Sequence, residues 1–305
     1  MKRIVIATIA AGFALAPAMA QEQAGGALTG ALKKIKDTAT ITIGYRESSV
    51  PFSYLDDKQQ PVGYAMDICG KIVDAVKKEL KLEKLEVKLN AVTSSTRIPL
   101  MANGTIDLEC GSTTNNAERQ KQVAYTNTHF LTASRYVTKG ASSIKTIDDL
   151  KGKTIVSTAG TTNIKQVAEA NTARNLGLNV IPAKDHAEAF LMVETDRAVA
   201  FVMDDILLSS LVASSKEPKS FVISDDAFSL PEPYGIMLRR DDAAFKAVAD
   251  AATAALFKSP DGAAIYAKWF TQAIPPRGLN LNVPMSAQMK KIFDKPTDSP
   301  DPAAY

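Results

Sequence analysis

The stretch Ile106–Arg119, IDLECGSTTNNAER, joins an apolar run to a polar segment rich in hydroxyl groups. Ile106–Cys110 has the character of a buried strand, and the polar remainder predicts the start of an amphipathic helix. Asn115 is the expected N-cap, with Glu118 three residues later in a capping-box arrangement. A helix N-terminus offers unpaired N–H groups and a positive dipole end. Together with the hydroxyls and the Arg119 guanidinium, these groups predict a seat for a carboxylate.

Strands and helices alternate on both sides of this stretch. The sequence predicts strands at Ile41–Tyr45, Leu85–Val92, Thr154–Ser157, Asn179–Ile181 and Ala198–Met203, and helices at Tyr64–Leu80, Thr96–Asn103, Thr162–Asn175, Ala187–Val193, Asp205–Ala213, Asp242–Lys258 and Gly262–Gln272. This alternation is typical of α/β proteins with doubly wound sheets. Two extended stretches, Tyr125–Val137 and Ser229–Arg239, interrupt it. We therefore expect two α/β lobes joined by two extended hinge crossings, with a cleft between them.

The N-terminus predicts that the protein is exported. Residues 1–20 have a basic start, an apolar stretch and the small-x-small ending Ala18-Met19-Ala20, which is the pattern of a signal peptide cleaved after Ala20. No later run reaches the roughly 20 apolar residues of a membrane span. The formal charge is +3, and removal of Lys2 and Arg3 with the leader lowers it to +1. Such a balance gives no argument for a nucleic-acid or membrane partner.

The same pattern divides the chain into segments. We expect the leader at 1–20, a first lobe at 21–130, a second lobe at 131–231 and a return to the first lobe at 232–285. Residues 286–305 form a polar, proline-rich tail for which we expect partial disorder. The two cysteines, Cys69 and Cys110, favour one disulfide in an exported chain, with two buried free thiols as the alternative. Closing this loop would stabilise the fold by about 4 kcal/mol.

Polar side chains follow the ends of the predicted strands, where open α/β sheets bind their ligands. In chain order they are Arg46, Ser94, Arg97, Ser112, Thr114, Arg119, Thr162, His186 and Asp204. Each has a simpler interpretation: an arginine can be a solvated charge or an ion pair, a hydroxyl or carboxylate can be a local helix cap, and His186 can be a rim histidine that donates to the backbone.

Short motifs run through the chain from the first predicted strand to the return crossing. They are Gly44-Tyr45-Arg46, Pro51-Phe52-Ser53-Tyr54, Gly63-Tyr64-Ala65-Met66-Asp67, Asn103-Gly104-Thr105-Ile106-Asp107, Arg119-Gln120, Leu150-Lys151-Gly152-Lys153 and Tyr234-Gly235-Ile236. Together they resemble the periplasmic amino-acid-binding proteins of ABC importers, the family 3 solute-binding proteins. Further segments, Ser94-Ser95-Thr96-Arg97, Cys110–Asn115, Lys184-Asp185-His186 and Met203-Asp204, are most similar to the glutamate/aspartate-binding members. The resemblance implies the two-lobed type II fold, a periplasmic location and a membrane permease as partner.

The resemblance and the chemistry of the residues assign the same roles. Arg119 holds the α-carboxylate of an amino acid through its guanidinium fork, with hydroxyls of Thr114 and Thr162 beside it. Asp204 takes the α-ammonium group, with Ser112 as a second acceptor. The remaining donors, Arg46, Ser94, Arg97 and His186, suit a second carboxylate on the ligand side chain. Three arginines against Asp204 leave the site at about +2, so we expect glutamate or aspartate as the ligand.

Two other classes of function stay open at this point. One is a binding protein for glutamine or asparagine, and the other is a periplasmic dehydratase-like enzyme on the same fold. A sensor lobe that signals is a further reading, although no signalling domain is present. The sequence has no nucleophile-elbow pattern, close histidine pair, phosphate loop or dinucleotide fingerprint. We therefore expect no catalysis, no cofactor and no metal, and a monomer that closes about its hinge around the ligand.

Overall fold

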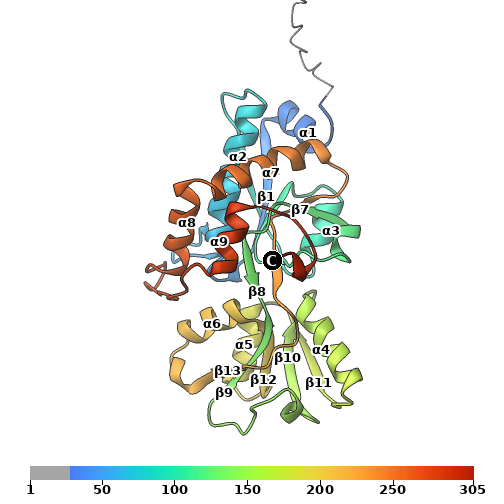
Figure 1. Cartoon of the computed structure of the whole chain (residues 1–305), viewed down its shortest axis with the longest axis vertical. Coiled ribbons are helices and arrows are strands. Elements are labelled where there is room, and N and C mark those ends of the chain that lie inside the picture. The colour runs from blue at the N-terminus through green and yellow to red at the C-terminus, as the bar shows by residue number, and fades with distance from the viewer. Residues whose placement is uncertain (1–27) are drawn as a thin grey trace, which may run out of the picture.

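Two lobes, each built on a mixed five-stranded sheet, make up the computed structural model, which describes residues 28–305 (Figure 1). The first sheet has the order β5-β1-β6-β15-β7 and the second β11-β10-β12-β9-β13. Strands of the first sheet are β1 (Thr40–Tyr45), β5 (Glu86–Ala91), β6 (Leu108–Cys110), β7 (Val123–Tyr125) and β15 (Met237–Arg239). Strands of the second are β9 (Ser134–Lys139), β10 (Thr154–Thr158), β11 (Asn179–Ala183), β12 (Ala200–Asp204) and β13 (Phe221–Ile223). The predicted two-lobed α/β fold is confirmed.

Helices flank both sheets. The first lobe carries α1 (Gly30–Thr38), α2 (Tyr64–Glu79), α3 (Arg97–Ala102), α7 (Ala243–Phe257), α8 (Pro260–Phe270) and α9 (Ala287–Asp294). The second carries α4 (Thr162–Ala173), α5 (His186–Glu194) and α6 (Asp205–Ser214). A small sheet of β2 (Ser48–Ser49), β3 (Ser53–Leu55) and β4 (Pro61–Val62) follows β1. Neither this sheet nor α1 was predicted, because both are short and α1 buries only Ala31, Leu32 and Ile35.

Parallel pairing brings the carboxyl ends of neighbouring strands to one edge of each sheet. Tyr45, the last residue of β1, pairs with Ala91 of β5 and Cys110 of β6. In the second sheet, Ser157 of β10 pairs with Pro182 of β11 and Val202 of β12. The segments that follow these strands therefore lie side by side, and they supply the polar residues listed from the sequence.

Two antiparallel strands carry the chain between the lobes. They are β8 (Phe130–Thr132), in the outward crossing, and β14 (Glu232–Tyr234), in the return crossing, and they pair directly. Phe52 of the first lobe meets Phe130 and Tyr234 edge-on, with ring centroids 5.1 and 5.2 Å apart. The two predicted extended crossings are therefore confirmed, and aromatic rings pack at their junction with the first lobe.

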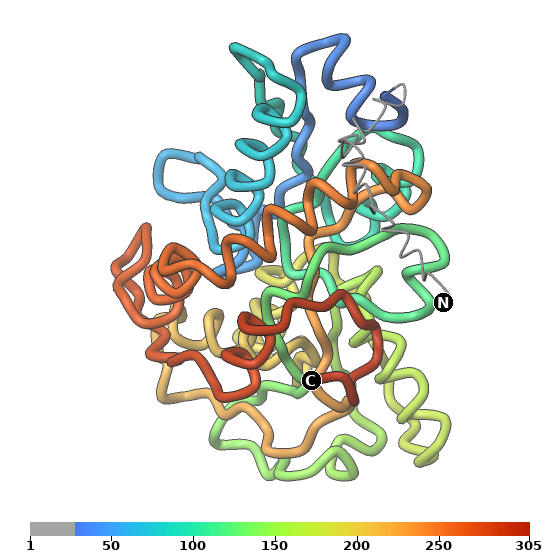
Figure 2. The backbone as a smooth tube through the Cα atoms, turned by 45° about the horizontal axis from the view of Figure 1, so that its top comes forward, coloured from blue at the N-terminus to red at the C-terminus, as the bar shows by residue number. Residues whose placement is uncertain are grey.

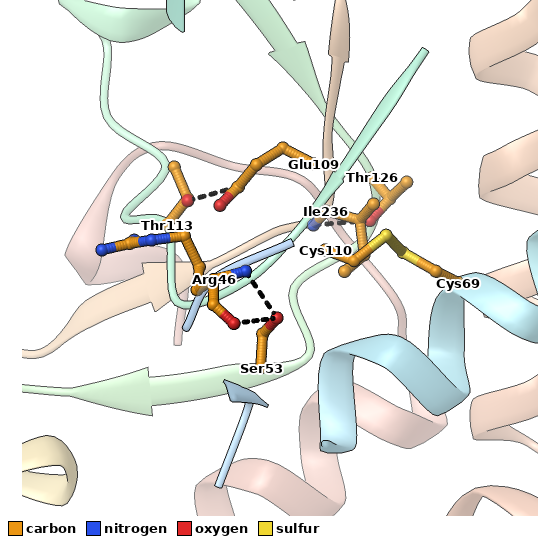
Figure 3. Close-up of a disulfide and its surroundings, with 8 residues drawn as sticks. All are labelled: Arg46, Ser53, Cys69, Glu109, Cys110, Thr113, Thr126 and Ile236. Atoms are coloured by element: carbon orange, nitrogen blue, oxygen red, sulfur yellow. Dashed lines mark hydrogen bonds between the residues drawn. A yellow bond between two sulfur atoms is a disulfide. The ribbon is translucent and has the colours of Figure 1, made fainter. Parts of the chain in front are cut away.

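A disulfide joins Cys69 of α2 to Cys110 at the end of β6 (Figure 3), with the Cα atoms 6.2 Å apart. Both cysteines are buried. The predicted disulfide is confirmed, and the alternative of two free thiols is wrong. The bond fastens the end of β6 to the helix behind the sheet, immediately before the loop that begins at Gly111.

The C-terminal tail is more ordered than the sequence predicts. Residues 286–305, for which partial disorder was predicted, contain α9 and then run back over the first lobe towards the hinge (Figure 2). Although its surroundings are polar and rich in proline, α9 buries Met289, Ile292 and Phe293 on one face. Phe293 stacks on Phe257 of α7 with centroids 4.5 Å apart. This buried face offsets the entropy cost of ordering the segment.

The predicted leader, 1–20, lies outside the described residues, and the predicted lobe boundaries stay predictions. Within 28–305, no helix has both the length and the apolar character needed to cross a membrane.

Candidate ligand-binding site

Side chains from both lobes line one narrow cavity beyond the carboxyl ends of the strands. Seven of the nine predicted site residues line it: Ser94, Arg97, Ser112, Thr114, Thr162, His186 and Asp204. The other two lie directly behind the lining, because Arg46 donates to Ser94 and Arg119 donates to the carbonyl of Thr114. The structure therefore brings all nine residues together.

Two arginines of the first lobe are almost fully buried. Arg46 follows β1 and donates from Nη2 to the Ser94 hydroxyl at 2.8 Å. Arg97, the first residue of α3, donates from Nη1 to the Ser112 carbonyl at 3.1 Å and to the Thr113 hydroxyl at 2.5 Å. Each side chain is 2% exposed. The simpler interpretation, in which these two arginines are solvated surface charges, is therefore wrong.

A buried carboxylate that the sequence reasoning missed lies behind Arg97. The Thr113 hydroxyl donates to Oε2 of Glu109 at 2.5 Å (Figure 3). Oε1 of Glu109 lies 3.9 Å from Nη1 of Arg97. Glu109 belongs to β6 and is fully buried. The presence of a charged residue inside an apolar strand could have indicated this carboxylate from the sequence. The negative charge of Glu109 lowers the expected net charge of the site from about +2 to about +1.

The segment after β6 is not the helix that the sequence predicts. Only one 3-10 turn, η1 (Arg119–Lys121), forms. Asn115 cannot act as its N-cap, because its side chain binds Gln120 and the Asp298 carbonyl instead. The N-cap residue of η1 is Glu118, which makes no side-chain capping bond, and the Arg119 amide donates to Oδ1 of Asn116 at 2.9 Å. The carboxylate seat therefore lacks a helix N-terminus on this side of the cavity.

Two helices of the second lobe supply the N-termini instead. Thr161 caps α4 by accepting from the Ile164 amide at 3.3 Å, and Thr162 is the first helical residue. His186 begins α5. Because Thr161, Thr162 and His186 line the cavity, the positive ends of both helix dipoles meet it. Such ends favour anionic groups.

His186 is an uncharged imidazole in the folded protein. Its Nδ1 lies 2.8 Å from the Thr158 hydroxyl. Burial lowers the pKa of His186 well below 6.5, and the positive charges of Arg46 and Arg97 lower it further. The ring therefore serves as a neutral hydrogen-bonding group at neutral pH and adds no charge to the site.

Asp204 is the carboxylate of the second lobe, at the end of β12. Oδ1 accepts from Nδ2 of Asn163 at 2.8 Å, and Oδ2 accepts from the hydroxyl of Tyr234 in the return crossing. Burial raises the pKa of Asp204 above its usual value. Nearby, burial and the charge of Asp204 raise the pKa of Glu232 to about 7. The side chain of Asp204 does not cap α6.

The lobes touch across the cavity, so the structure is a closed form. The hydroxyls of Thr114 and Thr162 lie 3.4 Å apart, and Nη2 of Arg119 donates to the Gly160 carbonyl at 3.2 Å. At the rim, Lys165 of α4 pairs with Glu118 at 2.7 Å. Arg119 therefore reaches across the cleft from the first lobe to the second.

Several polar atoms at this place are buried but unsatisfied. Within residues 28–305, Nη1 of Arg46, Nε of Arg97 and the hydroxyl of Ser112 have no hydrogen-bond partner. Buried donors of this kind are normally paired. A ligand with several acceptor oxygens suits them. Across the same described part of the chain, no cluster of three or more His, Cys, Asp or Glu residues could hold a metal ion.

Four further residues line the cavity: Thr161, Asn163, Met203 and Leu207. Thr161 follows the predicted strand Thr154–Ser157 together with Thr162, so its position was expected, and Asn163 was missed although it directly follows Thr162. Met203 belongs to the Met203-Asp204 motif, whereas Leu207 could not be predicted, because an apolar residue beside a polar site resembles any core residue.

Comparisons with known proteins agree with this geometry. The family model of the bacterial extracellular solute-binding proteins, family 3, matches residues 41–272. The chain is 51% identical to the L-glutamate/L-aspartate-binding protein of Pseudomonas aeruginosa, over 95% of this chain and 94% of that protein. It is 44% identical to the glutamate/aspartate import solute-binding protein of Escherichia coli, over 96% and 97%. A solved ancestral arginine-binding protein bound to arginine matches with a TM-score of 0.69 and 27% identity, over 76% of this chain and 98% of that one. The protein therefore belongs to the family 3 bacterial extracellular solute-binding proteins.

Proposed function

We propose that this protein captures L-glutamate or L-aspartate by closing its two lobes and delivers the ligand to the permease of an ABC importer. The observation that carries the proposal is the group of three buried arginines at one cavity, two of which keep unpartnered donors within the described chain. Two relatives with full-length similarity are named as glutamate/aspartate-binding proteins. A ligand with two carboxylates suits this group.

One part of the site suits the α-carboxylate and the α-ammonium group, which all amino acids share. Arg119 binds the α-carboxylate as a fork, assisted by the hydroxyls of Thr114 and Thr162. The N-terminus of α4 adds backbone N–H groups there. Asp204, held by Asn163 and Tyr234, takes the α-ammonium group with the hydroxyl of Ser112. Salt formation with the ammonium group favours the ionised form of Asp204 despite its burial.

The other part of the site suits the side chain of an acidic ligand. Arg46, Arg97, Ser94 and the neutral His186 all offer donors to a second carboxylate. An amide side chain cannot replace it, because two guanidinium ions would then stay buried without a full counter-charge. Leaving a buried charge unpaired costs several kcal/mol, which corresponds to a loss of affinity of about a hundredfold or more.

The overall charge supports the same ligand class. Arg46, Arg97 and Arg119 contribute three positive charges, and Asp204 and Glu109 contribute two negative ones, so one positive charge remains. Glutamate and aspartate each carry one net negative charge at neutral pH. The complex with either ligand is therefore close to neutral, which limits the cost of burying it.

Location and partners complete the proposal. The leader pattern in residues 1–20 supports export and cleavage after Ala20. We propose that the mature protein works as a monomer in the periplasm. Closure about β8 and β14 presents the loaded form to the membrane permease.

Calorimetric titration of the purified protein with glutamate, aspartate, glutamine and asparagine tests the proposal. Both acidic amino acids should bind at least about a hundredfold more tightly than their amides. Glutamine binding as tight as glutamate would contradict the acidic ligand. Binding of none of the four would contradict the function as a whole.

A further inference from the structure

The segment after α9 lies against both the cavity and the hinge. We call residues 295–305 the strap. It lies outside residues 41–272, which the family model matches. In Figure 1 it is the red end of the chain, between the first lobe and the crossings. Its contacts explain why it is ordered, and they reach residues next to the ligand-binding groups.

The strap holds the loop that carries Thr114 and Arg119. The carbonyl of Asp298 accepts from Nδ2 of Asn115 at 2.8 Å and from Nε2 of Gln120 at 3.2 Å. Asn115 is fully buried and directly follows Thr114, whose carbonyl accepts from Arg119. The two residues that hold the strap therefore flank the segment that places the Arg119 guanidinium.

Asn115 also connects this loop to the return crossing. Its backbone N–H donates to the carbonyl of Pro233 in β14 at 2.8 Å. The strap, the loop and the return crossing therefore meet at one buried residue. Asn115 does not line the cavity, and both polar atoms of its side chain are already bonded, one to the Asp298 carbonyl and the other to Gln120.

The strap binds the outward crossing as well. The N–H of Thr128 donates to the carbonyl of Thr297 at 2.8 Å. The hydroxyls of Thr128 and Tyr305 lie 2.7 Å apart, and Tyr305 donates to the Ser299 carbonyl at 2.7 Å. Thr128 is fully buried and lies two residues before β8.

Side chains anchor the strap to the body of the first lobe. Lys246 of α7 pairs with the Asp298 carboxylate at 2.8 Å, in a half-buried position. Immediately before the strap, Phe293 stacks on Phe257 of the same helix. The strap is thus fixed to α7 on one side and to the loop and the outward crossing on the other.

We propose that Asn115 and the strap are positioning elements for ligand binding, which hold Arg119 and both hinge crossings in the geometry of the closed cleft. Neither touches the ligand. Preorganised binding groups lose less freedom when the ligand arrives, so a loosened strap should weaken binding. Because Arg119 serves the part common to all amino acids, the effect should be equal for acidic and amide ligands. In this respect the inference rests on the proposed function.

The full-length double variant Lys246→Met/Tyr305→Phe tests the inference. It removes the ion pair between Lys246 and Asp298 and the hydroxyl contacts of Tyr305, and it leaves every residue of the cavity in place. Hydrogen exchange reports on loosening at the Thr128 amide, whose acceptor belongs to the strap. We expect this amide to exchange about tenfold faster, and the affinities for glutamate and glutamine both to fall about three- to tenfold, with an unchanged ratio.

A matched control is Lys33→Met, which removes a surface ion pair with Asp37 on α1 and should change neither quantity. Thr128→Val removes only the hydroxyl contact to Tyr305 and should act in the same direction with a smaller effect. Faster Thr128 exchange with unchanged affinity would overturn the positioning role. Unchanged exchange in the double variant would show that these anchors do not hold the strap, which overturns it equally. Failure of the proposed function would instead appear in the wild-type protein, as a loss of preference for acidic ligands.

Discussion

Arg46, Arg97 and Arg119 are buried on the first-lobe side of the cavity, although a guanidinium ion is costly to remove from water unless it is paired. Arg97 has Glu109 as a nearby counter-charge, and Arg119 is held by two carbonyls from different lobes. Arg46 has only the hydroxyl of Ser94 among the described side chains. These unequal surroundings agree with the proposed division between one arginine that serves every amino acid and two that select an acidic one.

Replacing Arg119 should remove binding altogether. Arg119→Ala deletes the fork for the α-carboxylate and the contact to the Gly160 carbonyl across the cleft. We expect affinity for glutamate, aspartate and glutamine alike to fall by at least about a hundredfold. Calorimetry on the three ligands measures this. Retained binding of any of them at wild-type affinity would show that Arg119 does not hold the shared carboxylate.

His129 in the outward crossing predicts a pH dependence of stability. Both ring nitrogens are buried without partners among the described residues, and burial lowers the pKa of His129 to about 3. The unfolded chain takes up this proton near pH 6.5, so the folded state loses stability as pH falls from about 6.5 towards 3.

The variant His129→Leu removes this group and should flatten the pH dependence. Between pH 7 and pH 4 the wild type should lose about 3 kcal/mol of unfolding free energy more than the variant does. Denaturant unfolding at a series of pH values measures the difference. Parallel pH profiles for the two proteins would show that His129 does not titrate in this way.

At the scale of elements, periodicity located most strands and helices, because their apolar residues repeat with the period of the element. It failed where tertiary contacts decide the local structure. Asn115 has the sequence environment of an N-cap, yet its side chain binds the strap, which lies 183 residues away in the chain. The order of residues 295–305 could not be predicted either, because it depends on backbone carbonyls that meet Thr128 and Asn115 only in the folded protein.

The candidate site was predicted more completely than the elements around it. All nine residues converge, because each follows a strand whose end lies at the same edge. Glu109 and Asn163 were missed for different reasons. Glu109 was read as part of an apolar strand, and Asn163 lies within α4, one residue past the expected donors. The preference for an acidic ligand could be predicted from the arginines alone. The net charge of the site could not, because it also depends on Glu109.

The disulfide connects two elements and should contribute strongly to stability. The double variant Cys69→Ser/Cys110→Ser opens a loop with a sequence separation of 41 residues. We expect the free energy of unfolding to fall by about 4 kcal/mol. Thermal or denaturant unfolding of both proteins under oxidising conditions measures this. A reduced wild type should match the variant, and an oxidised wild type no more stable than the variant would contradict the expectation.

At the scale of the whole molecule, closure depends on a close approach of the two backbones. Gly160 precedes α4 with φ +79°, and an added Cβ would lie 2.6 Å from the Cα of Ser95 and 2.7 Å from the carbonyl oxygen of Ser94 across the cleft. Both neighbours are backbone atoms, so they cannot move aside as a flexible side chain can. Only glycine allows the lobes to meet at this point.

Gly160→Ala should therefore prevent full closure and weaken binding of all ligands by at least about tenfold. The matched control is Gly152→Ala, at φ +70° in the same lobe, where an added Cβ meets nothing within 4 Å. It carries similar backbone strain but should close normally. Small-angle scattering with and without glutamate reports on closure. Equal compaction of the two variants with glutamate would contradict the role of this contact.

In the proposed division of roles, Arg97 and its neighbours select the side-chain carboxylate, while Arg119 binds the part that all amino acids share. Calorimetry of the variant Arg97→Met with glutamate and glutamine, beside the wild type, tests this division, since methionine keeps much of the side-chain volume. The affinity for glutamate should fall by about a hundredfold and that for glutamine by less than about tenfold, so the preference for glutamate shrinks at least about tenfold. An equal loss for both ligands would contradict this division of roles.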